Sequence, residues 1–108
     1  MISIDDFTKV HMAVGKILSA EKIADTDKLL ILKVDFGEET LRQVISGIAL
    51  HFPTPEILIN RKFVFVINLE PRTIRGFESQ AMILAANSTD AFSLLEVGDA
   101  VPVGTKLK

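Results

Sequence analysis

Leu30-Ile31-Leu32-Lys33-Val34-Asp35-Phe36 gives the clearest structural signal in the chain, because its apolar residues recur with a period of two. Every even-numbered position in it is apolar, whereas Lys33 and Asp35 fall on the opposite face of an extended chain. Leu29 and Ile31 add apolar side chains to this second face. This pattern predicts a β-strand over residues 28–36 with one buried face.

The segments on either side of this strand predict further strands. Gly37-Glu38-Glu39 suits a turn into a strand over residues 41–46, so the two strands are expected to form a hairpin. Before it, residues 12–23 are rich in β-compatible side chains and should form the first strand. Gly15 within that strand indicates a bulge or a sharp barrel bend.

The second half of the chain predicts three more strands. Residues 62–69 contain the run Phe63-Val64-Phe65-Val66-Ile67, whose apolar density is typical of a strand buried on both faces or at an interface. Pro71 should end it. Residues 78–86 are expected to form another strand, and a short one over residues 93–97 precedes a tail rich in glycine and proline.

Two short helices are expected. Ser3 and Asp6 resemble a capping box, and the apolar residues that follow have helical spacing, so a helix is predicted over residues 4–11. The segment Pro53–Asn60 should carry the second helix, with Thr54 as its N-cap. The last residue of that segment can adopt the left-handed conformation that ends helices.

Five or six short strands with one intervening short helix fit a small closed barrel better than a sandwich, which usually needs about seven strands. We therefore expect an all-β protein with the OB-fold, a five-stranded Greek-key barrel. The chain has 108 residues, close to the common size of a single hydrophobic core. Residues 1–108 are expected to form one domain.

Composition excludes several classes of protein. The chain has no cysteine, so disulfides and cysteine-based metal sites are excluded. Its net charge of −2 and pI near 5.6 disfavour a surface that is basic throughout, so any nucleic-acid site must be a local patch. There is no signal-peptide pattern and no long apolar run, which predicts a soluble cytoplasmic protein without a membrane partner.

Asn68-Leu69-Glu70-Pro71-Arg72-Thr73-Ile74-Arg75-Gly76 is the most informative candidate site. A buried strand runs out here into a segment fixed by Pro71 that carries Arg72 and Arg75. Guanidinium groups on such a loop suit phosphate oxygens or the flat face of a base. The alternative is that the stretch is only a solvated hairpin turn.

Neighbouring side chains extend this candidate site. Ser79 and Gln80 lie between apolar residues, where they could hydrogen-bond base edges, and Met82 offers an apolar contact. Lys28 and Arg42 belong to the predicted hairpin, which forms one wall of an OB barrel and the face that such folds use for oligonucleotides. A core or surface role for each of these residues stays open.

Catalysis has little support in the sequence. His11 and His51 have no evident carboxylate or nucleophile partner, and there is no nucleophile elbow, phosphate loop or two-histidine metal motif. We expect no catalytic residue, no metal and no cofactor. Most of the phenylalanines sit in core patterns, which disfavours a general base-stacking platform. Phe77 is the one aromatic candidate for a contact, although a core role is more common.

Motifs in a fixed order resemble the tRNA-binding domain family. They are Val14-Gly15-Lys16-Ile17, Asp27-Lys28-Leu29, Arg42-Gln43-Val44-Ile45-Ser46-Gly47-Ile48, and Asn68-Leu69-Glu70-Pro71-Arg72 continuing to Ser79-Gln80-Ala81-Met82-Ile83-Leu84-Ala85-Ala86. This family occurs at the C-terminus of bacterial methionyl-tRNA synthetases, as a separate beta subunit and as a free structure-specific tRNA-binding protein. The resemblance covers almost the whole chain.

The resemblance implies an OB-fold that dimerises through its N-terminal helix and a C-terminal extension and grips the outer corner of tRNA. It implies non-catalytic, structure-specific tRNA binding by a homodimer, supplying tRNA affinity to methionyl-tRNA synthetase in cis or in trans. The residues that match tRNA-contacting or groove-lining positions are Lys28, Arg42, Asn68, Arg72, Ser79 and Met82. Local chemistry adds Arg75 and Gln80.

Two departures from the family pattern bear on affinity. Ala81 stands where the family usually has glycine, and its methyl group is expected to narrow the groove beside Met82. Glu70 stands where lysine is common and places a negative charge near Arg72. Both departures predict weaker tRNA binding than that of a typical member.

Two alternatives to the tRNA-binding function stay open. The chain also resembles the CsaA branch of the same fold family, which implies a peptide-binding chaperone with an apolar groove. It could also serve mainly as a dimerisation module of the synthetase, with tight self-association and negligible RNA affinity.

Overall fold

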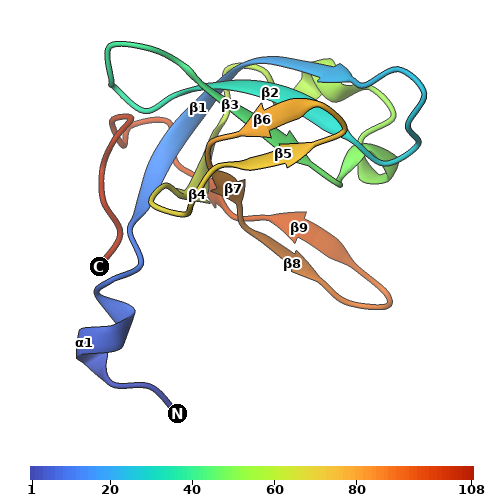
Figure 1. The fold of residues 1–108 in the computed structure, drawn as a ribbon. Helices are drawn as coiled ribbons and strands as arrows, with labels where there is room; N and C mark the ends of the chain where they lie inside the picture. The colour runs from blue at the N-terminus through green and yellow to red at the C-terminus, as the bar shows by residue number, and fades with distance from the viewer.

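The structure is a computed structural model that describes all 108 residues, and its secondary structure is almost entirely β (Figure 1). None of its helices is long and apolar enough to cross a membrane. The helical elements are α1 (Ile4–Phe7) and two 3₁₀ helices, η1 (Ala49–His51) and η2 (Pro55–Leu58). The strands are β1 (Met12–Lys22), β2 (Leu30–Asp35), β3 (Arg42–Ser46), β4 (Lys62–Val66), β5 (Arg72–Ile74), β6 (Phe77–Ser79), β7 (Met82–Ile83), β8 (Ala85–Asn87), β9 (Phe92–Leu94) and β10 (Glu96–Val97).

The main sheet has the strand order β10-β4-β1-β2-β3, and β7 also pairs with β4. Each pairing is antiparallel, and the fourth strand lies beside the first, as in a Greek key. The first half of β4 pairs with β10 and its last two residues pair with β7. The all-β, OB-like fold that the sequence predicts is confirmed.

The two strands with the clearest sequence patterns form, but both are shorter than predicted, and β4 ends at Val66 instead of Leu69. In β2 the buried residues alternate with half-buried ones, and Leu30, Leu32 and Val34 are completely enclosed. In β4 the four residues Phe63–Val66 are all buried, so both faces of this strand are covered. The ring of Phe36 packs edge-on against Phe65, with 5.1 Å between their centroids. These side chains form the centre of the barrel core.

Gly15 allows close packing of the core. The bulge or bend predicted at this residue is not there, because the irregularity of β1 lies further along the strand. The register between β1 and β2 shifts between Ile17 and Ser19. A Cβ atom at residue 15 would lie only 2.6 Å from both Phe36 Cε1 and Val34 Cγ1. The glycine therefore lets two core side chains cross directly over the backbone of β1.

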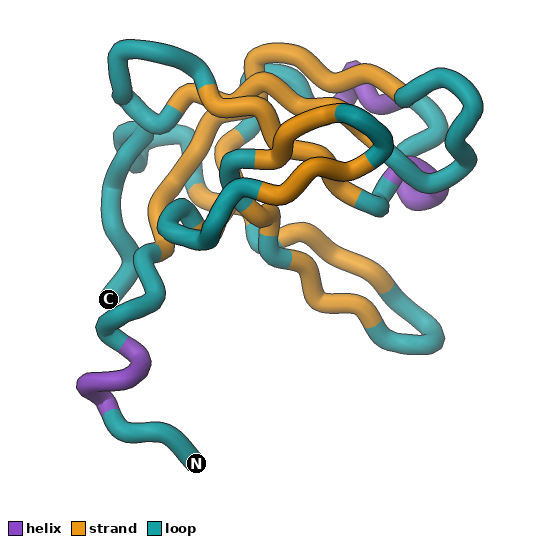
Figure 2. The backbone as a smooth tube through the Cα atoms, viewed as in Figure 1, coloured by secondary structure: helices purple, strands orange, loops and turns teal.

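The N-terminal helix is shorter than the predicted 4–11. Ser3 and Asp6 form the expected capping box, but the helix ends at Phe7. None of its residues is buried, so no packing supports a longer helix, and a helix of this length is marginal in water. In Figure 2 it projects from the barrel on its own.

The connection between β3 and β4 carries two 3₁₀ helices where one helix was predicted. Thr54 makes no side-chain cap, which corrects that expectation, because its backbone does not have the extended conformation of an N-cap. Asn60 is left-handed, with φ of 69°, as predicted. This residue turns the chain into β4, and its N–H donates to the carbonyl of Ile17 at 2.7 Å.

The predicted strand over residues 78–86 is wrong as a single element. It is divided among β6, β7 and β8, with breaks at Gln80–Ala81 and at Leu84. The first break occurs where the chain turns to pair with β3. After the second break, β8 pairs with β9 as a hairpin that projects from the barrel (Figure 2).

The C-terminal segment returns along the start of β1. Val14 N–H donates to Thr105 O at 2.9 Å, and Leu107 N–H donates to Met12 O at 3.0 Å. Lys62 Nζ holds the preceding turn through the carbonyls of Asp99 and Val101, each at 2.7 Å. The N-terminal helix and the C-terminal tail consequently lie at the same side of the barrel (Figure 1).

Candidate functional site

The Asn68–Gly76 stretch leads into a tight hairpin made of β5 and β6. Arg72 faces Ser79 across the hairpin, and Ile74 faces Phe77. The two residues of the turn, Arg75 and Gly76, have φ of 53° and 83°. Positive φ at both central residues is the signature of a type I′ turn, whose twist matches that of the two strands. The hairpin therefore carries one arginine in a strand and one at its tip.

A groove lies where this hairpin meets β3 and β7. Its lining is mainly apolar, with Arg72 and Glu70 as the charged exceptions. Cross-strand pairing places Arg72, Ile74 and Ser79 on the same face of the hairpin, toward the groove. The lining residues are Ile45, Ser46, Leu69, Glu70, Arg72, Ile74, Ser79, Ala81, Met82 and Ile83.

Side chains from the second strand of the hairpin complete the hydrogen bonds of the outer edge of β3. Ile45 N–H donates to Ser79 Oγ at 3.0 Å, and Gln43 N–H donates to Gln80 Oε1 at 2.8 Å. The backbone N–H of Gln80 in turn donates to Gln43 O at 2.8 Å. Two side chains and one backbone N–H thus bind the edge of β3 where the chain passes from β6 to β7.

Arg42 is fully engaged within the protein. Its Nε and one terminal nitrogen donate to the two carboxylate oxygens of Glu38, each at 2.8 Å. The other terminal nitrogen donates to the carbonyls of Ile67 at 2.6 Å and Gln80 at 3.1 Å. The hydrogen bonds from Arg42 lower the pKa of the Glu38 carboxyl below its usual value, and those to Glu38 raise the pKa of the guanidinium.

Asn68 joins the N-terminal segment to the barrel. Its Oδ1 accepts from the backbone N–H of His11 at 2.8 Å, and its Nδ2 donates to Lys9 O at 2.7 Å. Both ends of the amide are therefore used. The resemblance predicts that Asn68 contacts RNA. In the structure its side chain also holds residues 9–11 against the barrel.

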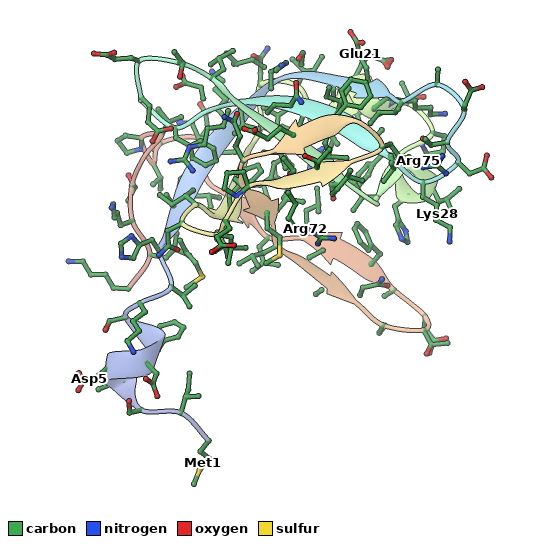
Figure 3. The ribbon with its side chains drawn as sticks, viewed as in Figure 1. Met1, Asp5, Glu21, Lys28, Arg72 and Arg75 are labelled. Atoms are coloured by element: carbon green, nitrogen blue, oxygen red, sulfur yellow. The ribbon has the colours of Figure 1, made fainter.

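The remaining predicted residues have side chains without internal partners. Lys28, Arg72 and Arg75 are exposed and make no side-chain hydrogen bond or ion pair, and Met82 is 45% exposed at the groove. In Figure 3 Lys28 and Arg75 lie at the same end of the barrel, and Arg72 lies nearer the middle of the view. Of these three cations only Arg72 lines the groove, while Arg75 lies at the tip of the same hairpin and Lys28 lies in the loop between β1 and β2.

The two departures from the family pattern lie at this groove. Ala81 is almost fully buried, so its methyl group contacts the groove wall rather than solvent. Glu70 lines the same groove as Arg72 but forms no ion pair with it. The guanidinium of Arg72 is therefore not neutralised by a direct contact.

No cluster of acidic and histidine side chains that could hold a metal ion occurs in the structure. Every buried side-chain nitrogen or oxygen has a hydrogen-bond partner. What the fold and the groove define is a small OB-like binding domain.

Comparison with known proteins gives the family. Residues 12–106 match the family described as "Putative tRNA binding domain". The chain is 43% identical over 106 residues to a methionine–tRNA ligase of Caldanaerobacter subterraneus, covering 98% of this chain and 16% of that enzyme. The chain belongs to the tRNA-binding domain family, as the motifs predict. It spans only about a sixth of the length of the curated relatives it matches.

Solved structures agree with this assignment. A MetRS related protein from Pyrococcus horikoshii superimposes with a TM-score of 0.93 at 43% identity, covering 100% of this chain and 98% of that protein. The chaperone CsaA from Bacillus anthracis superimposes with a TM-score of 0.86 at 28% identity, covering 100% of this chain and 99% of that protein. The domain is therefore related both to synthetases for methionine and to CsaA proteins.

Proposed function

We propose that this domain binds folded tRNA without chemistry of its own and supplies tRNA affinity to methionyl-tRNA synthetase, in cis or in trans, in the cytoplasm. The observation that supports this most is the β5–β6 hairpin, which presents Arg72 and Arg75 beside a groove without any internal partner. Unpaired guanidinium groups suit phosphate oxygens, which they can contact with two hydrogen bonds. Lys28 adds a third free cation.

The conformation of the hairpin tip adds to this argument. Arg75 occupies a left-handed backbone position that asparagine or glycine would adopt at lower cost. An unfavourable backbone conformation at an exposed turn indicates that the side chain there has a function, such as binding a ligand. Its contact with phosphate would be such a use.

The decisive experiment titrates labelled bulk tRNA with the protein at two salt concentrations, with an unstructured RNA of equal length as competitor. Arg72→Ala combined with Arg75→Ala should weaken tRNA binding by about tenfold or more and lower the salt slope by about 1 for each arginine that contacts a phosphate. Lys22→Ala is the matched control, because Lys22 is exposed, has no side-chain partner and lies outside the groove.

The variant Arg72→Lys with Arg75→Lys separates charge from shape. It keeps both charges but loses the forked donors, so it should recover part of the affinity. If the double alanine variant binds tRNA as the unmodified protein does at near-physiological salt, the hairpin is not the tRNA site.

The proposed assembly is a homodimer through α1 and the C-terminal tail. Ile4 is 72% exposed on a helix that makes no contact with the core, and Phe7 and Val10 are also exposed. These residues line an apolar cleft with Met12 and Leu107. A one-turn helix is not stable in water by itself, so a second copy covering this cleft would account for its order.

The dimer is tested by Ile4→Glu with Phe7→Glu, followed by light scattering. The charged side chains should shift the protein toward monomer, because they cannot be buried without a partner. Leu50→Glu is the control, since Leu50 is 65% exposed on η1, away from the cleft. A dimer mass that persists in the double variant would place the interface elsewhere.

A second candidate function is peptide binding. The likeness to CsaA covers the whole chain, and six of the ten groove-lining residues are hydrophobic. Such a groove would accept an apolar side chain of a peptide. The titration separates the two functions, because a peptide chaperone would show no salt-sensitive preference for tRNA. A protein that forms dimers but binds neither ligand would be a dimerisation module.

A further inference from the structure

The rings of His51 and Phe92 form a parallel stack on the surface of the barrel. Their centroids are 3.8 Å apart, and their planes differ by only 5°. His51 is the last residue of η1, whereas Phe92 is the first residue of β9. The stack therefore joins the connection between β3 and β4 to the projecting β8–β9 hairpin.

The ring of Phe92 covers one face of the His51 imidazole. Phe92 is half-buried and packs against the barrel core, and Phe52 approaches it at 6.0 Å with the rings 74° apart. Its outer face is the one that His51 covers. One side of the imidazole is thus fixed by packing, and the ring orientation is set before any ligand binds.

The other side of the imidazole has no partner within the protein. His51 is exposed, and its ring nitrogens make no hydrogen bond or ion pair. It belongs to no metal-binding group. The protein therefore holds a flat aromatic ring in a fixed orientation with one face open to solvent.

This stack lies beside one of the free cations. Ala49 N–H donates to the backbone carbonyl of Lys28 at 2.9 Å, so η1 rests directly on the loop between β1 and β2. In Figure 1 this short helix, which follows β3, lies between that loop and the β8–β9 hairpin. The segment that carries the stacked imidazole and the segment that carries the exposed Lys28 are consequently adjacent along the backbone contact of Ala49 with Lys28.

We propose that His51, backed by Phe92, stacks on an unpaired nucleobase of the bound RNA while Lys28 contacts a phosphate beside it. This inference rests on the proposed tRNA binding and names the part of the ligand that one surface recognises. Histidine and phenylalanine are both used by proteins to stack on splayed-out bases. A nucleobase fits better than a peptide side chain, because a nucleotide pairs a flat ring with an adjacent negative charge.

The test compares two ligands with the 108-residue chain: folded tRNA and an RNA duplex with the same number of phosphates but no unpaired base. His51→Ala should weaken tRNA binding by about five- to tenfold, as expected for the loss of one base stack, and should change duplex binding less than about twofold. The salt slope should stay the same, since stacking releases no counterions.

Two variants control for shape and chemistry. His51→Phe keeps a flat ring and should retain affinity for tRNA, whereas Leu50→Ala alters the same helix beside the stack and should have no effect. A loss of tRNA affinity in His51→Phe as large as in His51→Ala would overturn stacking in favour of a hydrogen bond from the imidazole.

The outcomes also separate this inference from the proposed function. If His51→Ala binds tRNA normally while the double arginine variant does not, the stack is wrong and tRNA binding stands. If His51→Ala weakens tRNA and duplex binding equally, the stack is also wrong, because the effect is then not specific for unpaired bases. If the unmodified protein fails to bind tRNA, the proposed function itself fails.

Discussion

The junction between β3 and β6 and the two arginines of the β5–β6 hairpin lie close together, but the polar side chains of these two regions are occupied in opposite ways. Arg42 at the edge, and Ser79 and Gln80 that cover it, are saturated with internal hydrogen bonds. Arg72 and Arg75 on the hairpin have no internal partner. The difference shows that proximity to a groove does not by itself make a polar residue a ligand contact.

The two regions therefore predict different consequences of substitution. Removing a saturated side chain leaves a backbone group without a partner inside the protein, so stability should fall. Removing a free side chain leaves the protein intact, so only ligand affinity should fall. Stability and tRNA affinity measured on the same variants test whether the two regions differ in this way.

Ser79→Ala should produce the largest loss of stability at the groove. The buried N–H of Ile45 would lose its acceptor, which costs about 2 kcal/mol of the free energy of unfolding. Urea denaturation measures this loss. Affinity for tRNA, measured under conditions where the variant is folded, should change by less than about twofold, because an internal contact contributes no free energy to binding.

Ser46→Ala is the matched control for Ser79→Ala. Ser46 lines the same groove, but its hydroxyl makes no hydrogen bond within the protein. Its removal should change the free energy of unfolding by less than about 0.5 kcal/mol. Equal stability of the two variants, together with a large loss of tRNA affinity in Ser79→Ala, would make Ser79 a contact residue and remove the distinction between the regions.

Much of the fold was predictable because it depends on local patterns. The alternation in β2, the apolar run in β4 and the left-handed Asn60 are each visible within a few residues of sequence. The division of residues 78–86 was not predictable in this way. It depends on Gln80 pairing with Gln43, which lies 37 residues earlier in the chain.

The candidate site also contains features that depend on local sequence and features that depend on residues far apart in the chain. The arginine pair was predictable because both residues follow Pro71 in a short polar segment. The sequence could not show that Arg42 is saturated, since two of its four acceptor atoms are the carbonyl oxygens of Ile67 and Gln80, which are distant in sequence. It could not show the stack of His51 on Phe92 either, because two surface rings far apart in sequence carry no pattern.

Arg75→Asn tests one of the two arginines that have no internal partner. It should raise the stability of the protein, whereas Ser79→Ala should lower it, and the change should be smaller. Asparagine followed by glycine is the preferred sequence of a type I′ turn, so the substitution should relieve the unfavourable φ of 53°. We expect the free energy of unfolding to rise by about 0.5–1 kcal/mol. Affinity for tRNA should fall by about threefold, because one cation is lost from the hairpin tip.

Arg72→Asn distinguishes this effect from a general benefit of removing charge. Arg72 lies in an extended strand, where asparagine offers no advantage, so stability should not rise while tRNA affinity should still fall. A gain of stability in Arg75→Asn without any loss of affinity would mean that the tip does not contact RNA. The opposed changes would instead show that the turn tolerates a costly backbone conformation because its guanidinium is used in binding.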